Sequence, residues 1–197
     1  MKKNEIISAL EPLIQAFDES GVLYYISGSI ASSALGKARA TMDVDMVSNL
    51  QPFQIKALSE KLNKIYYLDE EMILDAVKTK SSFNLIHLES MLKIDIFVLN
   101  DSPYQQAAFE RKIKDKLENE PDSINVFLCS SEDIILNKLV WFKDGGEISE
   151  RQWLDVIGVI KVQANNLNKD YLKKWAEHLG IAPLLNRAFS ECELTGL

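Results

Sequence analysis

The 197-residue sequence has no long apolar run. None of its segments approaches the roughly 18 consecutive apolar residues that a membrane-spanning helix needs. Its first residues, Met1 to Lys3, lead into Asn4 and Glu5 and not into the apolar core of a secretory signal. We therefore expect a soluble protein that has no membrane partner and works in the cytoplasm.

Cysteine is also scarce, and basic residues are fewer than acidic ones. Cys129 and Cys192 are far apart, form no CxxC motif and have no histidine pair nearby, which argues against a disulfide framework and against a zinc site. The formal net charge is −7. Because nonspecific binding to nucleic acid depends on Lys and Arg that neutralise phosphates, we expect weak long-range attraction to bare nucleic acid. A local basic pocket remains compatible with this charge.

Hydrophobic periodicity predicts alternating helices and strands in the first two thirds of the chain. The strand patterns are short, and they are either nearly continuous apolar runs or strict alternations. We predict helices at 5–17, 30–35 and 52–62 and strands at 22–26, 42–47, 82–88, 91–99 and 124–128.

The last third of the chain is predicted to be helical. Ser130 with Asp133, and Ser149 with Gln152, have the spacing of capping boxes that open helices. Two further helices are predicted after Asn168 and Pro183. The predicted fold is α/β (α+β), with a mixed sheet flanked by helices at 1–129 and a helical C-terminal region at 130–197 that packs on this core.

Three aspartates lie in two of the predicted strands. Asp43 and Asp45 are two residues apart, so both side chains point to the same side of a strand. Asp95 projects from the face of its strand opposite the aliphatic row. Like charges on one strand face repel unless a cation lies between them, and Mg²⁺ prefers oxygen ligands of this kind. A third carboxylate would allow two metal ions to act on a phosphoryl displacement.

A second motif precedes the aspartates. Gly28 and Ser29 follow a buried strand and precede a helix, where free backbone N–H groups and a hydroxyl can bind an anion. Arg39 offers a fork of donors to a phosphate. Taken alone, each of these residues has an ordinary reading as a turn, a surface cation or an exposed strand residue. Their order along the chain favours a common site.

Together, Gly28-Ser29-Ile30-Ala31, then Gly36, Arg39, Thr41, Asp43 and Asp45, with Asp95 in Lys93-Ile94-Asp95-Ile96-Phe97, resemble the DNA polymerase β-like nucleotidyltransferase superfamily. The sequence looks most like bacterial stand-alone members, which include toxins of toxin–antitoxin pairs. The helix that begins at Ser131 and carries Lys138, and the later Trp153-Leu154-Asp155, also resemble the C-terminal region of that group.

The resemblance implies a metal-dependent nucleotidyltransferase with catalytic and metal-binding residues Asp43, Asp45 and Asp95. Two Mg²⁺ ions would be its cofactors and an NTP such as ATP its substrate. Asp95 would activate the acceptor hydroxyl or position the group that does. The nucleotide-binding residues implied are Gly28, Ser29, Arg39 and Lys138. For Lys138 a packing role at the edge of an apolar helix stripe is an equal alternative.

Two other functions stay open at this stage. The chain could be a weakly catalytic or non-catalytic partner-binding component of a toxin–antitoxin type system, with a small protein as its partner. It could also be a metal-free α/β domain in which the aspartate pair caps a loop. The sequence does not identify the acceptor, for which a small molecule, a tRNA end and a protein are all candidates, nor the oligomeric state.

Overall fold

The computed structural model describes residues 3–38, 41, 43–116 and 124–194, which form two compact units. The first unit comprises Met1–Ser27 and Ala40–Leu128, and the second comprises Gly28–Arg39 and Cys129–Leu197. The chain therefore leaves the first unit at Gly28 and returns to it before the second strand. These bounds differ from the predicted ranges 1–129 and 130–197 mainly because the segment Gly28–Arg39 belongs to the second unit.

The first unit is built on a seven-stranded mixed sheet with the order β3-β4-β5-β2-β1-β7-β6. Its central strand β2 pairs in parallel with β5 and antiparallel with β1, while β1 pairs in parallel with β7. The strands are β1 (Tyr24–Ile26), β2 (Asp43–Ser48), β3 (Tyr66–Tyr67), β4 (Ser82–His87), β5 (Lys93–Val98), β6 (Ile113–Lys116) and β7 (Asn125–Leu128).

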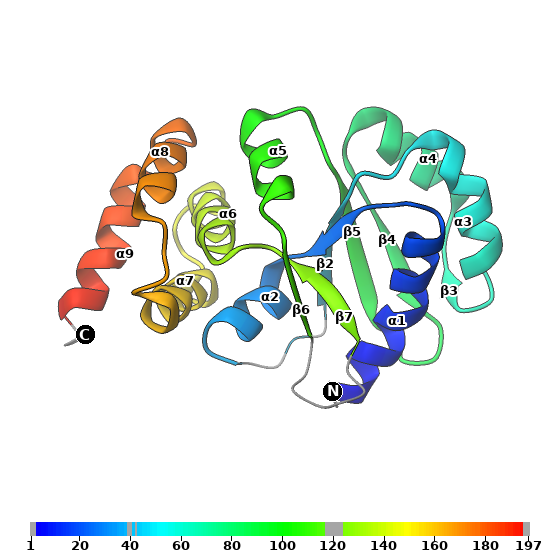
Figure 1. Ribbon diagram of the computed structural model, residues 1–197, viewed down its shortest axis with the longest axis horizontal. Helices are drawn as coiled ribbons and strands as arrows, with labels where there is room; N and C mark the ends of the chain where they lie inside the picture. Colours follow the sequence, from blue (N-terminus) through cyan, green and yellow to red (C-terminus); the bar gives the residue numbers. More distant parts are fainter. Residues whose placement is uncertain (1–2, 39–40, 42, 117–123, 195–197) are drawn as a thin grey trace. The chain divides into compact units, whose positions relative to one another are not determined.

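Helices cover one face of this sheet. Figure 1 shows α1, α3 and α4 together on one side of it. Their apolar stripes supply fully buried residues such as Leu10, Leu13 and Phe17 of α1, which is the expected result of a 3.6-residue period facing a core. The helical segments of the unit are α1 (Lys3–Glu19), the 3₁₀ helix η1 (Pro52–Gln54), α3 (Ile55–Leu62), α4 (Glu70–Thr79) and α5 (Pro103–Glu110).

The alternation of β2 and β5 decides which side chains meet that core. Val44 and Met46 of β2, and Ile94 and Ile96 of β5, are completely buried. Their neighbours along each strand are half-buried or exposed. Because successive side chains of a strand point to opposite faces, the charged residues of both strands share the other face of the sheet.

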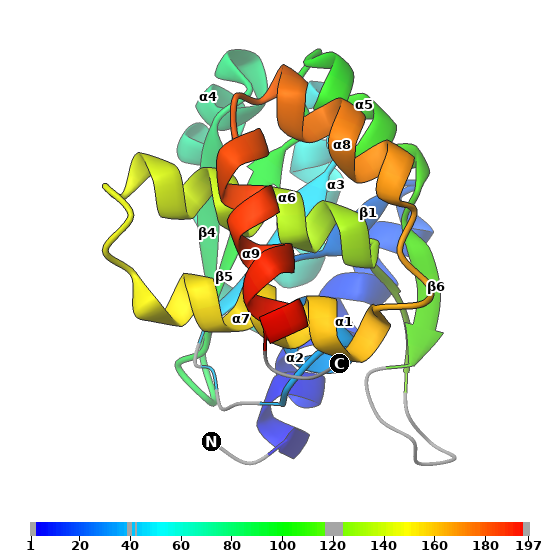
Figure 2. The same ribbon diagram turned by 90° about the vertical axis from the view of Figure 1, so that its left-hand side faces the viewer.

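The second unit is helical. Its helices are α2 (Gly28–Leu35), α6 (Ser131–Asp144), α7 (Glu150–Gln163), α8 (Lys169–His178) and α9 (Ala182–Leu194). In Figure 2 the orange and red helices α8 and α9 lie in front of α6 and α7. The hydroxyls of Ser130 and Ser149 accept the backbone N–H groups of Asp133 and Gln152, so both predicted helix caps are confirmed.

The predicted fold class is confirmed, and each predicted helix and strand has a counterpart. The predicted helix at 52–62 is divided, because a 3₁₀ turn precedes α3. The strand β3, the helices α4 and α5 and the edge strand β6 were not predicted. Among the described helices, none combines the length and the apolar character needed to cross a membrane.

Candidate active site

The pairing of β2 with β5 brings the three aspartates of the first unit to one face of the sheet. The two strands run in parallel with Asp45 opposite Asp95 and Asp43 opposite Lys93. Partners in adjacent strands point to the same face, and residues two apart in one strand share a face. Asp43, Asp45 and Asp95 therefore all lie on the polar face, opposite the buried aliphatic rows. The predicted orientation of Asp95 is confirmed.

A lysine that the sequence analysis did not select lies on the same face. The Nζ atom of Lys93 is 2.8 Å from Oδ1 of Asp95 and donates a hydrogen bond to Oδ2 at 2.9 Å. The hydrogen bond to Asp95 raises the pKa of Lys93, and the charges of Asp95, Asp43 and Asp45 act in the same direction, although partial burial opposes them. The contact with Asp95 therefore favours the charged form of Lys93. The sequence signal for this contact was the position of Lys93 two residues before Asp95, which places both side chains on one face of a strand.

The first strand ends beside Asp45. The backbone N–H of Ser27, directly after β1, donates to the carbonyl oxygen of Asp45 at 2.8 Å. The next residue is Gly28, whose φ of 57° is in the left-handed region that favours glycine. The glycine is thus required for the turn that starts α2. The strand end and the aspartate strand are held together by this hydrogen bond.

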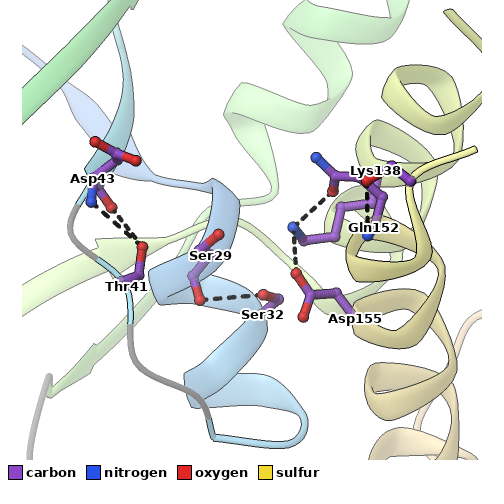
Figure 3. Close-up of polar contacts among 8 residues, drawn as sticks. Ser29, Ser32, Thr41, Asp43, Lys138, Gln152 and Asp155 are labelled. Atoms are coloured by element: carbon purple, nitrogen blue, oxygen red, sulfur yellow. Dashed lines mark hydrogen bonds and ion pairs between the residues drawn. The ribbon is translucent and has the colours of Figure 1, made fainter. Parts of the chain in front are cut away.

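The entry to β2 is fixed by a threonine. Thr41 Oγ1 donates to the carbonyl oxygen of Asp43 at 3.2 Å and accepts the N–H of Asp43 at 3.4 Å (Figure 3). These contacts set the direction in which the strand begins. Arg39, predicted to bind phosphate, lies outside the described residues.

The remaining predicted residues belong to the second unit. Ser29 lies in the first turn of α2, where its carbonyl oxygen accepts a hydrogen bond from Ser32 Oγ at 3.1 Å. Lys138 extends from α6 toward α7, where its Nζ atom is 2.8 Å from Oδ2 of Asp155 and 3.0 Å from Oε1 of Gln152 (Figure 3). The Lys138 side chain is 1% exposed and that of Asp155 is 6% exposed.

Helices α2 and α7 pack closely within this unit. A Cβ atom added to Gly36, just after α2, would lie 2.9 Å from both the backbone nitrogen and Cγ2 of Val159. Ser32 is one turn before Gly36, and Asp155 is one turn before Val159. The helical repeat therefore places Ser32 and Asp155 on the facing sides of the two helices, in agreement with Figure 3.

The carboxylates of the first unit suit a hard divalent cation by their chemistry. Asp43, Asp45 and Asp95 supply oxygen ligands on one face, which is the donor type that Mg²⁺ takes. Among the described side chains, no group of three or more His, Cys, Asp or Glu has the spacing of a metal site as it stands. The backbone register thus places three carboxylates on one face, while the Asp95 oxygens are engaged by Lys93.

Solved structures with similar folds are nucleotidyltransferases. The antibiotic-resistance factor ANT(2'')-Ia matches with a TM-score of 0.55 and 13% identity, over 98% of either chain. An antigenic nucleotidyltransferase-like protein from Paracoccidioides brasiliensis matches with a TM-score of 0.52 and 15% identity, over 95% of this chain and 92% of the other. The chain has the nucleotidyltransferase fold.

A third solved structure and two comparisons of sequence do not extend this result. The lincosamide antibiotic adenylyltransferase LnuA, with lincomycin bound, covers 79% of this chain and 96% of its own at 16% identity, with a TM-score of 0.46. No protein-family model matches the chain, and no curated protein is detectably similar to it in sequence. The nucleotidyltransferase fold therefore rests on structural likeness, and the site rests on the geometry of its own residues.

Proposed function

We propose that the protein is a metal-dependent nucleotidyltransferase that transfers a nucleoside monophosphate from an NTP to a hydroxyl acceptor. The observation that carries the proposal is the parallel pairing of β2 with β5, in which Asp45 is opposite Asp95 and Asp43 is on the same face. Three carboxylates on one face of two adjacent strands, with Lys93 as a single cation beside them, are costly for folding alone. Their placement is explained by a need for cations and phosphate at this face.

The reaction is a displacement at the α-phosphorus of the NTP. The acceptor oxygen forms a bond to phosphorus, the bond from phosphorus to the oxygen that bridges to the β-phosphate breaks, and pyrophosphate leaves with that electron pair. The proton of the acceptor hydroxyl passes to Asp95 or to a water that Asp95 orients. Asp43 and Asp45 would hold two Mg²⁺ ions together with Asp95, and the ions would neutralise charge on the attacking and leaving oxygens.

The nucleotide phosphates are assigned to the turn after β1. Gly28 and Ser29 follow directly on Ser27, whose N–H is bonded to the backbone of Asp45. The N-terminus of a helix favours an anion. We also assign phosphate binding to Arg39 and Lys138. Lys138 already has the buried Asp155 as its ion partner, so it would contribute through its field while it keeps that bond.

The likeness to enzymes of toxin–antitoxin systems stays a prediction, as do ATP as the preferred nucleotide and a cytoplasmic site of action. The acceptor class is open among a small molecule, a tRNA end and a protein. The two structural matches above a TM-score of 0.5 have 13% and 15% identity, too little to transfer a substrate. The acceptor therefore has to be found by experiment.

Transfer of label from NTPs tests the proposal directly. The protein is incubated with Mg²⁺, each α-labelled NTP in turn and a cell extract, and the label is followed into RNA, protein and small molecules. We expect label in one fraction and loss of that label in EDTA. Asp45→Asn should reduce transfer at least about 100-fold, because removing even a partner outside the metal ligands typically costs 10–100-fold.

The control for that variant is Glu19→Gln, which removes one carboxylate charge from α1 of the same unit. It should leave transfer unchanged. Calorimetric titration of the wild-type protein with each Mg²⁺–NTP complex provides a second measurement. Absence of metal-dependent nucleotide binding, together with absence of label in every fraction, would refute the proposed activity.

A further inference from the structure

Lys93 occupies both carboxylate oxygens of Asp95. Its Nζ atom is 2.8 Å from Oδ1 and 2.9 Å from Oδ2. An ammonium group within hydrogen-bond distance of both oxygens of a carboxylate forms charge-assisted contacts with them. In the structure as it stands, Asp95 is therefore engaged by a cation that belongs to the protein.

The other two aspartates lie on the same face as this pair. Lys93 is the register partner of Asp43, and Asp45 is the register partner of Asp95. All four side chains lie on one face of two adjacent strands. The charges of Asp95, Asp43 and Asp45 all favour the charged form of Lys93. One positive charge thus offsets part of the charge of three carboxylates, at the place where a like-charge cluster would otherwise destabilise the strands.

We propose that Lys93 is a built-in counter-ion of the aspartate cluster, which competes with divalent cations for Asp95 and has to release this carboxylate before it can take part in nucleotide transfer. The second half of this statement rests on the proposed function. The first half concerns the folded protein alone.

The exposure of the pair makes this release feasible. The Lys93 side chain is 47% exposed and that of Asp95 is 24% exposed. Lysine has a flexible stem and a strongly hydrated head, so the ammonium group can move into solvent at little cost. A divalent cation brings twice the charge to the same oxygens. The exchange therefore replaces one cation by a more highly charged one and leaves no carboxylate unpaired.

The competition is tested with Lys93→Met, which keeps most of the apolar stem and removes the charge. The probe is Mn²⁺, titrated without nucleotide and followed by electron paramagnetic resonance. We expect Lys93→Met to bind Mn²⁺ about two- to fivefold more tightly than wild type, as loss of an exposed ion pair implies. Lys93→Arg should restore the wild-type affinity, since it keeps the charge. The difference should shrink in high salt.

The matched control is Lys61→Met. Lys61 forms an exposed ion pair of its own with Glu19 at 2.6 Å, with side chains 41% and 48% exposed. Both variants change the net charge by one unit, so a general effect of charge would tighten Mn²⁺ binding equally in both. Equal or weaker Mn²⁺ binding by Lys93→Met, compared with this control, would overturn the competition.

A double-mutant cycle in EDTA tests the counter-ion role without any metal. Lys93→Met should lower the melting temperature by about 1–3 °C, and Asp95→Asn in the same chain should remove most of that loss. Additive effects of the two substitutions would overturn the counter-ion role. If neither wild type nor any variant binds Mn²⁺, the competition fails. The proposed function is still decided by nucleotide binding and label transfer, and this cycle still decides the counter-ion role.

Discussion

Two lysine–aspartate pairs of equal length are found in the two units of this protein. In the first unit, Lys93 and Asp95 of β5 are 2.8 Å apart and partly exposed. In the second unit, Lys138 of α6 and Asp155 of α7 are also 2.8 Å apart, but their side chains are almost completely buried. The distance is the same, and the surroundings decide how each pair behaves.

Burial changes the consequence of breaking a pair. Charges near water recover hydration when their partner leaves, so an exposed pair contributes little to stability. A buried charge that loses its partner has no water to replace it, and the loss is large. We therefore regard the Lys138–Asp155 pair as a fixed link between α6 and α7. The Lys93–Asp95 pair is exchangeable, as a site that admits other cations requires.

The largest effect is expected from Asp155→Asn. The substitution keeps the shape of the side chain and removes the carboxylate charge from beside the buried ammonium group of Lys138. We expect the free energy of unfolding to fall by about 3–5 kcal/mol, measured by urea denaturation of the purified chain.

The control for this prediction replaces both charges. A variant with Lys138→Met and Asp155→Leu removes both charges of the pair, and apolar replacements of buried ion pairs are often neutral or stabilising. It should therefore recover most of the lost stability. For Asp155→Asn alone, a loss below about 1 kcal/mol is what an exposed pair would give. That result would show that burial does not distinguish the two pairs.

Gly36→Ala tests whether the second unit also tolerates substitution poorly where Gly36 packs against α7. The added Cβ would lie 2.9 Å from the carbonyl oxygen of Ser32 and from the backbone nitrogen of Val159, and backbone atoms cannot easily move away. We expect a loss of about 1–3 kcal/mol in the free energy of unfolding, as overpacking of an interior typically costs.

Gly158→Ala is the matched control for that substitution. Its added Cβ would meet the Cβ and backbone nitrogen of Lys37 at 3.4 Å, an ordinary contact distance. Alanine also favours a helix interior over glycine by roughly 0.5–1 kcal/mol. This variant should therefore be neutral or slightly more stable in the same urea experiment. A similar loss in both variants would mean that close approach at Gly36 is not the cause.

The sequence sufficed for the parts of the fold in which pattern and burial agree. The alternation of β2 and β5 placed Asp43, Asp45 and Asp95 opposite the aliphatic rows, as the structure has them. The serine caps of α6 and α7 were readable because a hydroxyl three residues before its donor is a local signal. Pairing between β2 and β5 is a long-range property, and no local pattern contains the register.

The elements that were missed carry weak or mixed patterns. β6 is exposed along its whole length and has no apolar alternation to detect. The start of α4 did have a signal, since the carboxylate of Asp69 accepts the N–H groups of Glu71 and Met72. In the site, the role of Lys93 depends on its distance to Asp95. The alternation of side chains along a strand predicts that Lys93 and Asp95 share a face, but only the side-chain geometry establishes the contact.

Asp69→Ala measures a local contribution in the first unit. Oδ1 of Asp69 is 2.9 Å from the nitrogen of Glu71 and 3.0 Å from that of Met72, so the substitution leaves two N–H groups of the first turn of α4 to water. We expect a loss of about 1 kcal/mol in urea denaturation, the usual contribution of a helix cap. Asp69→Asn, which keeps an acceptor oxygen, should retain most of the stability. Equal losses in both variants would contradict the capping role.

Asp95→Asn should have the smallest effect on stability, although it is chemically the same change as Asp155→Asn. It breaks the ion pair with Lys93, but it also removes one of three like charges from the strand face, and the two contributions oppose each other. We expect the free energy of unfolding in EDTA to stay within about 0.5 kcal/mol of wild type. A loss of several kcal/mol would mean that the exposed pair is as fixed as the buried one, and that Asp95 is not free to exchange its cation.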